Sequence, residues 1–152
     1  MFFLNQAKDT PLLQELLREG VFTSAFWEAL PLPADGHLMD VLIAHAGKVP
    51  ERPWLDWLIR KHNCTRIPGL EPTPAFIKST DRRLLTDSVR YDCYPLSLGE
   101  NHIYVGIGRP DYPQHPPALC DFFKKKVIYR NALTIKEIER LRSLCGQALQ
   151  SL

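Results

Sequence analysis

The spacing of the apolar residues changes once along this chain, and that change constrains the fold more than any other feature. Up to about residue 90, apolar residues recur every three or four positions, which is typical of one face of a helix. From residue 93 onward, apolar residues also gather in short runs bounded by Gly and Pro, which is typical of strands. The 13 Pro residues among 152 favour short elements over a few long helices. We therefore predict an α+β fold, in which a helical N-terminal part precedes a small β-β-α-β-α part.

The segment 1–67 is predicted to be a helical subdomain of two tandem helix-turn-helix units. Thr10 can cap the first helix, and leucines follow it at helical spacing. Gly20 and Gly47 each end a helix, and each stands seven positions before a tryptophan, which is Trp27 in the first unit and Trp54 in the second. This internal similarity suggests that the second unit repeats the first.

A Pro-rich linker at 68–74 is predicted to lead into an α+β subdomain at 75–152. The elements expected there are short helices within 75–90, strands at 93–98, 102–107 and 126–130, a Pro-rich loop at 110–117, a short helix at 119–123 and a long final helix. Thr134 and Glu137 have the spacing of a capping box, so they mark the start of that final helix.

Charge and apolar content bear on the class of protein. A net charge of +2 gives no strong reason to expect a nucleic-acid or membrane partner. No run of about 20 apolar residues is present, and the four apolar residues at the N-terminus are too few for a signal peptide. The sequence therefore predicts a cytoplasmic protein. Its cysteines form no Cys-x-x-Cys pair, so we expect free, buried thiols at Cys64, Cys93, Cys120 and Cys145.

Aromatic residues of the helical part are the first candidates for a binding surface. Trp54 and Trp57 lie three positions apart and share one face of their helix. Packing in the core is one interpretation of this pair. Partial exposure would instead make them interface anchors, because Trp is enriched at binding hot spots. With Phe26 and Trp27, they form the predicted partner-binding surface.

The strongest cationic cluster is the second candidate. It consists of Lys124, Lys125 and Lys126, with Arg130 four residues further on. Aromatic residues stand on both sides of the lysines, and such a mixture can bind single-stranded nucleic acid. The other interpretations are a solvated entry to a strand, a site for an acidic protein partner and a site for phospholipid headgroups.

Signals for catalysis and metal binding are weak. Asp111, His115 and Cys120 could be a nucleophile with its base, but no nucleophile elbow or cysteine-protease signature surrounds them. No Gly-x-x-x-x-Gly-Lys-Ser/Thr loop is present to cradle the phosphates of a nucleotide. His62 and Cys64 form one close pair of ligand type, whereas a zinc site needs four ligands. We therefore predict that the chain is not an enzyme and holds neither a cofactor nor a metal.

Three local patterns resemble the N-terminal domain of the ATPases of type II secretion and type IV pilus assembly. The tandem helical units resemble that family's repeat of an apolar helix, a Gly, an apolar pair and a second helix. Residues 84–96, LLTDSVRYDCYPL, resemble its passage from a short helix into the first strand. Residues 103–110, IYVGIGRP, resemble its second strand, which usually closes on Asp-Pro where this chain has Arg109-Pro110.

The resemblance implies a regulatory or docking domain that couples a cytoplasmic ATPase to the inner membrane. On that basis we expect a non-catalytic adaptor that binds another protein. Its partner would be a cytoplasmic or inner-membrane component of a secretion or pilus machine. The implied location is the cytoplasm, with peripheral association at the inner membrane.

In some members of that family, the tandem units bind cyclic di-GMP through an Arg-Leu-Gly sequence that opens each unit. The matching positions here are Pro11-Leu12-Leu13 and Leu38-Met39-Asp40, so both Arg and both Gly are missing. A cyclic di-GMP sensor with a degenerate site is therefore one alternative function. Weak binding of nucleic acid through Lys124–Lys126 is the other.

Overall fold

The structure, a computed structural model, describes residues 10–31, 38–109 and 115–150. Its helical part contains α1 (Thr10–Arg18), α2 (Ser24–Ala29), α3 (Leu38–Ala44), the short 3₁₀ helix η2 (Ala46–Lys48) and α4 (Glu51–Lys61). The remainder contains α5 (Pro74–Ser79), α6 (Arg82–Tyr91), β1 (Cys93–Leu98), β2 (His102–Ile107), α7 (Pro117–Phe122), β3 (Val127–Ala132) and α8 (Ile135–Gln150). This order confirms the predicted α+β fold, with a helical N-terminal part followed by β-β-α-β-α.

The strands of the C-terminal part form a three-stranded sheet in the order β1-β2-β3. β1 and β2 are an antiparallel hairpin, whereas β2 and β3 run parallel and are connected through α7. The antiparallel register shifts between Pro95 and Ser97, which places a bulge in β1. It follows from these directions that β1 ends where β2 and β3 begin, at one end of the sheet.

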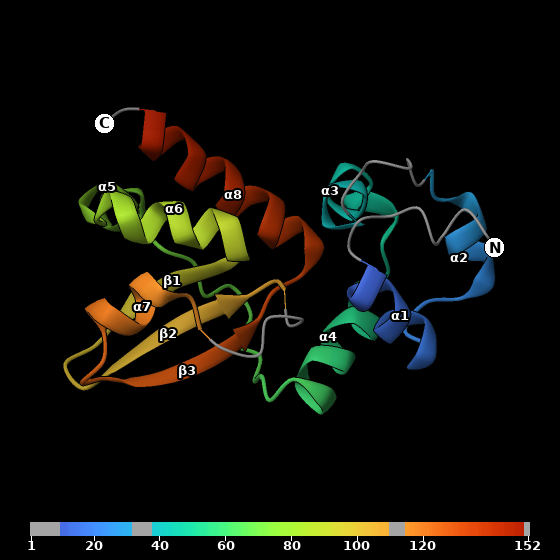
Figure 1. Cartoon of the computed structure of the whole chain (residues 1–152), viewed down its shortest axis with the longest axis horizontal. Helices are drawn as coiled ribbons and strands as arrows, with labels where there is room; N and C mark the ends of the chain where they lie inside the picture. Colours follow the sequence, from blue (N-terminus) through green and yellow to red (C-terminus); the bar gives the residue numbers. More distant parts are fainter. Residues whose placement is uncertain (1–9, 32–37, 110–114, 151–152) are drawn as a thin grey trace.

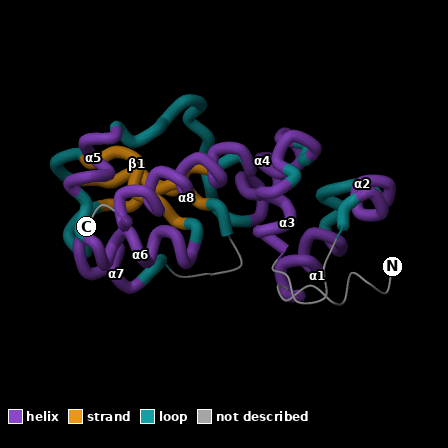
Figure 2. Tube along the Cα trace, turned by 90° about the horizontal axis from the view of Figure 1, so that it is seen from above, coloured by secondary structure: helices purple, strands orange, loops and turns teal. Residues whose placement is uncertain are grey.

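Helix α8 connects the two parts of the molecule. Figure 1 shows α5, α6 and α8 together beside the sheet, with α1 to α4 beyond the start of α8. Figure 2 shows the same division from above. Helix α8 packs against α5 and α6 in the C-terminal part and against α3 and η2 in the helical part.

The predicted capping box forms at the start of α8. The N–H of Thr134 donates to Oε1 of Glu137 at 2.9 Å, and the N–H of Glu137 donates to Oγ1 of Thr134 at 3.1 Å. Glu137 also accepts hydrogen bonds of 2.6 and 3.3 Å from the guanidinium of Arg66. The start of α8 is therefore tied to the segment that follows α4.

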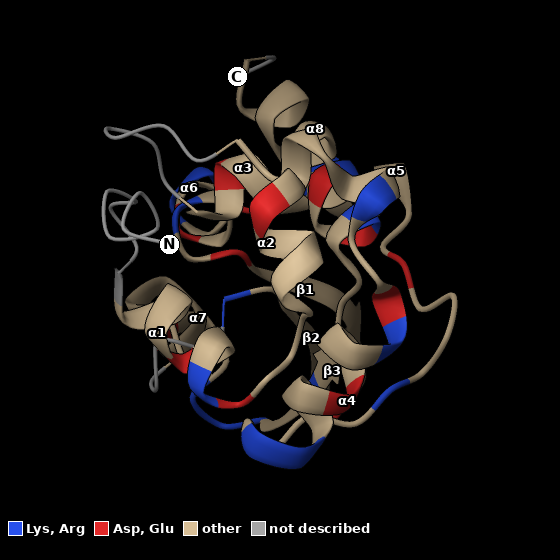
Figure 3. Cartoon of the chain, turned by 90° about the vertical axis from the view of Figure 1, so that its right-hand side faces the viewer, with Lys and Arg blue, Asp and Glu red and all other residues tan. Residues whose placement is uncertain are grey.

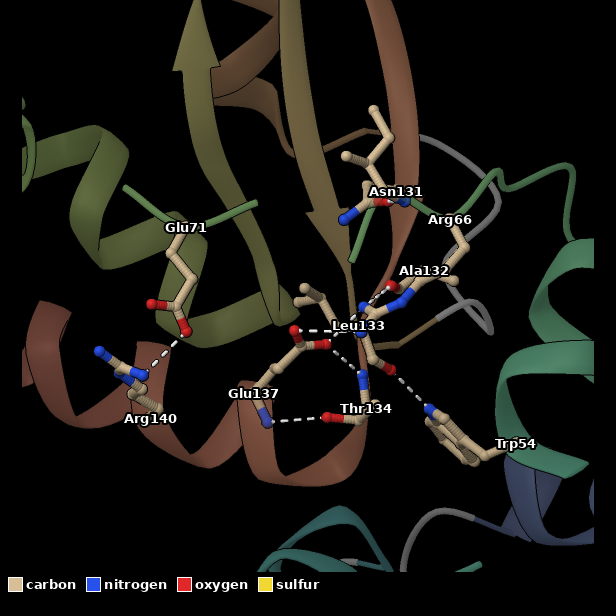
Figure 4. Close-up of polar contacts among 10 residues, drawn as sticks. Trp54, Arg66, Glu71, Asn131, Ala132, Leu133, Thr134, Glu137 and Arg140 are labelled. Carbon is tan, nitrogen blue, oxygen red and sulfur yellow. Dashed lines mark hydrogen bonds and ion pairs between the residues drawn. The ribbon is translucent and has the colours of Figure 1, made fainter. Parts of the chain in front are cut away.

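That same segment and α4 dock the helical part on the sheet (Figure 4). Thr65 forms a single parallel bridge with Asn131 of β3, and Oδ1 of Asn131 accepts from the N–H of Ile67 at 2.6 Å. The buried Nε1 of Trp54 donates to the carbonyl of Leu133 at 2.8 Å. Buried apolar side chains from both parts belong to one continuous cluster, so the two parts share a core.

The buried carboxylate of Asp92 is bonded to residues of β1 and α8, and through α8 the network reaches α3. Asp92 lies between α6 and β1 in the left-handed conformation, with φ of 46° and no exposed surface. Arg142 of α8 donates to both of its oxygens at 3.1 and 2.8 Å, and the hydroxyl of Tyr94 donates to one of them at 2.6 Å. Nη1 of Arg142 also donates to Asp40 of α3 at 2.8 Å. Burial, together with the charge of Asp92, raises the pKa of Tyr94, so its hydroxyl remains a donor.

Candidate functional site

The aromatic residues predicted to bind a partner lie mostly inside the molecule. The exposed fraction is 2% for Trp27 and 0% for Trp54 and Trp57, while Phe26 is half-buried. The prediction of an exposed aromatic surface is therefore wrong for the three tryptophans. Core packing, the other interpretation of the Trp54–Trp57 pair, agrees with their position.

The physical reason is the shortness of the helices in this part. Helices of six to eleven residues each offer little apolar area, so the largest rings are needed to fill the space between them. The ring of Phe22 stacks on Trp54 with the centroids 6.3 Å apart and meets Trp27 edge-on at 5.7 Å. The ring of Trp54 lies 5.3 Å from that of Trp57. These four rings form the centre of the helical core.

The predicted basic patch is also divided. Lys124 and Lys125 are exposed in the turn between α7 and β3. Lys126 instead donates from its amino group to the carbonyls of Gly99 and Glu100, at 3.0 and 2.6 Å, which closes the turn between β1 and β2. Acidic and basic segments are interspersed on the side of the molecule that Figure 3 shows.

Arg130 leaves the patch because its side chain points to the covered face of the sheet, opposite to the exposed Val127 and Tyr129. It pairs in register with the buried Val105 and is itself half-buried. Its Nη1 lies 3.1 Å from Nε2 of His115, and its buried Nε has no hydrogen-bond partner in the described part of the chain. Burial, and then the charge of Arg130, lower the pKa of His115, which favours a neutral ring that accepts from the guanidinium. The prediction that Arg130 and the three lysines form one patch is therefore wrong.

Of the three residues that could suggest a nucleophile and its base, Asp111 lies outside the described residues. The thiol of Cys120 lies 3.7 Å from the backbone carbonyl of His115, while the ring of His115 meets Arg130. The residues that the structure describes contain no group of three or more side chains placed to hold a metal ion. None of the helices in the described ranges combines the length and apolar character that crossing a membrane would require.

Apolar and aromatic side chains that are exposed or half-buried lie at the end of the sheet where β1 finishes and β2 and β3 begin. We call this surface the hairpin end. Its members are Leu98, His102, Tyr104, Phe122, Val127 and Tyr129. His102 and Tyr104 are half-buried, and the register places Leu98 on the opposite face of the sheet from Tyr104 and Tyr129. Leu98, Phe122, Val127 and Tyr129 are between 46% and 55% exposed. Lys124 and Lys125 stand in the turn that leads into β3, at the same end.

A ring cluster covers one face of this hairpin end. Tyr104 of β2 is in register with Tyr129 of β3, so the two side chains point to the same face of the sheet. Their ring centroids are 5.2 Å apart, and the ring of His102 lies 5.5 Å from Tyr104 and 5.9 Å from Tyr129. A shallow hollow of about 400 Å³ lies beside this end, lined by Asn101, Phe122, Phe123, the three lysines 124–126 and the acidic residues Glu100 and Asp121.

Sequence reasoning did not single out the hairpin end. The available signal was the alternation His102-Ile103-Tyr104-Val105, which places the two aromatic residues on one face of a strand. The partner ring, Tyr129, is 25 positions away from Tyr104. Only the parallel register of β2 and β3 brings the two rings together.

The positions that match the cyclic di-GMP sequence are largely buried. Leu12 and Leu13 are 1% exposed, and Leu38 and Met39 are fully buried. Asp40, the last of them, is exposed but pairs with Arg142. No cationic side chain stands at these six positions to meet a phosphate.

The prediction of four buried thiols holds for Cys64, Cys93 and Cys145 and is wrong for Cys120, which is exposed near the end of α7. All four are free. Burial raises the pKa of Cys93 to about 12 and that of Cys145 to about 11, and it also raises the pKa of Cys64. Burial also blocks access of a reagent to these three sulfurs.

An aromatic disulfide reagent at pH 8 should therefore modify one thiol of the native protein quickly, that of Cys120. The other three should react only after unfolding, because burial blocks access to their sulfurs and raises their pKa. For Cys93, a pKa of about 12 leaves roughly one thiolate in ten thousand at this pH. Absorbance during the reaction measures the number of fast thiols, and Cys120→Ser should remove the fast phase. Two or more fast thiols in the native protein would contradict the described burial.

No protein-family model matches the chain, and no curated protein or solved structure matches it either. The resemblance to the N-terminal domains of secretion and pilus ATPases thus stays a prediction from the three local patterns.

Proposed function

We propose that this protein is a non-catalytic docking domain that binds another protein through the hairpin end of its sheet. The observation that supports this most is the exposure of Val127 and Tyr129, at 55% and 46%, on the face of the sheet that also carries the rings of His102 and Tyr104. Single exposed apolar side chains are common on soluble proteins, whereas a contiguous group is typical of an interaction site. Aromatic residues are also enriched at the centres of protein interfaces.

The hairpin end replaces the tryptophans as the candidate docking surface. Its two neighbouring cations, Lys124 and Lys125, are at the rim, where charged residues commonly steer a partner and set its orientation. The resemblance to secretion and pilus ATPases favours an adaptor of such a machine. We therefore propose a partner that is a cytoplasmic or inner-membrane component, and a cytoplasmic location with peripheral association at the inner membrane.

Site-specific photo-cross-linking in cells of the source organism tests this proposal. A photo-reactive phenylalanine analogue at position 122 places the probe on the hairpin end, and the same analogue at position 139 places it on the exposed side of α8 as a control. We expect one defined protein adduct from position 122 and none from position 139. Adducts with nucleic acid alone would favour the nucleic-acid alternative, and the absence of any adduct at position 122 would contradict docking.

Cyclic di-GMP is not expected to stabilise the protein. A ligand present at a hundred times its dissociation constant would raise the free energy of unfolding by about 2.7 kcal/mol, which a thermal melt detects readily. Four of the six matching positions are buried, Pro11 is uncharged and Asp40 carries a carboxylate. We therefore expect no shift of Tm with cyclic di-GMP or other cyclic dinucleotides. A saturable shift would favour the sensor alternative over the adaptor.

A further inference from the structure

The outer edge of β3 is paired over only part of its length. Thr65 pairs with the second half of β3. The N–H of Thr65 donates to the carbonyl of Arg130 at 2.9 Å, and the N–H of Ala132 donates to the carbonyl of Thr65 at 2.8 Å. No other bridge to this edge is present among the described residues. The first half of the strand therefore has an open edge in the described part of the chain.

The hydrogen bonds of β3 identify which groups face outward. The N–H of Val127 donates to Asn101 and that of Leu133 donates to Ile107, so the odd-numbered residues of β3 bond to β2. The backbone N–H and C=O groups of the even-numbered residues consequently point to the outer edge, as the two backbone bonds with Thr65 confirm. Both backbone groups of Ile128 and the N–H of Arg130 thus point outward. None of the backbone bonds among the described residues at this edge uses them.

The chain itself turns away from this half of the edge. Asn63, which follows the C-cap His62 of α4, adopts a left-handed conformation with φ of 55°, so the residues before Cys64 do not continue as a strand. At the opposite edge of the sheet, β1 contains Pro95 and a bulge, two features that commonly protect an edge from further pairing. No proline lies within β3. The two edges of the sheet therefore differ in their capacity to accept another strand.

The side chains around the open half favour an acidic, partly apolar strand. Val127 and Tyr129 are 55% and 46% exposed on the face that an added strand would extend. Lys124 and Lys125 are exposed just before β3, and neither is in an ion pair with another described residue. Carboxylates near one end of an added strand would meet these two cations, and alternate apolar side chains would cover Val127 and Tyr129.

We propose that the open half of the β3 edge receives an extended acidic segment of a partner protein as an additional strand. Its backbone pairs with Ile128 and Arg130, its apolar side chains pack on Val127 and Tyr129, and its carboxylates lie near Lys124 and Lys125. This inference rests on the proposed docking function and specifies the mode of binding and the chemistry of the partner.

Selection from a displayed library of random twelve-residue peptides tests the inference on the whole chain. We expect enriched peptides to alternate apolar residues with polar ones and to carry Asp or Glu at one end. One enriched peptide is then synthesised and added to the protein for amide hydrogen exchange. The amides of Ile128 and Arg130 should exchange at least about tenfold more slowly in the complex, while that of Tyr129, already bonded to β2, should change little.

Charge reversal supplies the matched control. The double variant Lys124→Glu with Lys125→Glu should weaken the peptide about tenfold or more, because it replaces two attractions with repulsions. The double variant Lys48→Glu with Lys78→Glu changes the net charge equally at two exposed positions away from β3, and it should leave affinity within about twofold. A thermal melt of each variant shows whether it remains folded.

Several outcomes would overturn the inference. They are the absence of enriched acidic peptides, protection of amides other than Ile128 and Arg130, equal losses in the two double variants, and pairing of this edge with a second copy of the chain. None of these outcomes tests the proposal that the protein is a docking domain, because a cross-link at position 122 forms with a partner of any conformation. A cross-link without edge protection would leave docking intact and reject the added strand.

Discussion

Replacing Arg142 with methionine is expected to lower the free energy of unfolding by about 3–5 kcal/mol, because it leaves the carboxylate of Asp92 buried in the core without its cationic partner. Asp92 has no exposed surface, and Arg142 is its cationic partner through two hydrogen bonds of 3.1 and 2.8 Å. Methionine retains much of the apolar stem, so loss of the guanidinium should dominate. Urea unfolding at pH 7, followed by circular dichroism, measures the change.

The control for this variant removes the outer half of the same network. Asp40→Asn breaks only the 2.8 Å pair with Nη1 of Arg142, and the Asp40 side chain is 57% exposed. Exposed pairs contribute about 0–1 kcal/mol, so this variant should be nearly as stable as the wild type. Equal losses for Arg142→Met and Asp40→Asn would mean that Asp92 does not depend on the guanidinium.

Replacing Trp54 with phenylalanine should cost about 1–3 kcal/mol more than the same replacement at Trp57. Both side chains are fully buried, so both variants lose the same atoms from the core. They differ in one bond: Nε1 of Trp54 donates to the carbonyl of Leu133 at 2.8 Å, whereas Nε1 of Trp57 is buried and has no hydrogen-bond partner among the residues that the structure describes. Only the change at Trp54 removes a hydrogen bond between the helical part and the end of β3.

The comparison needs two measurements. Chemical unfolding gives the free energy for each variant, and exchange of the amides in α4 reports whether that helix opens separately from the sheet. We expect Trp54→Phe to loosen α4 selectively, since its bond crosses between the two parts of the molecule. If Trp57→Phe proves as costly as Trp54→Phe, the buried Trp54 hydrogen bond contributes little to stability.

Local chemistry accounts for the elements that the sequence predicted well. The strands 93–98 and 102–107 were predicted with the bounds that the structure has, because a Gly-containing turn separates two short apolar runs. The capping box of Thr134 and Glu137 also formed as predicted, since it depends on residues only three positions apart. Helix α4 starts at Glu51 and not after Pro53, because Pro53 is accommodated within the first turn of that helix.

The candidate site was predicted poorly, and the reason is again physical. Whether a tryptophan is an anchor or a core residue depends on how much space the neighbouring helices leave. For Trp54 that space is set by Phe22, Trp57 and Leu133, of which Leu133 is 79 positions away. A run of cations likewise does not reveal that Lys126 closes a distant turn and that Arg130 points to His115.

The sequence by itself determined the order of helices and strands, because the spacing of apolar residues and the positions of Gly, Pro and capping residues act within a few residues. The tertiary structure decided which of these residues reach the surface. Burial of Trp54, exposure of Tyr129 and the open edge beside Ile128 all depend on contacts between residues far apart in the chain. Such contacts follow from the packing of whole elements, which no local pattern encodes.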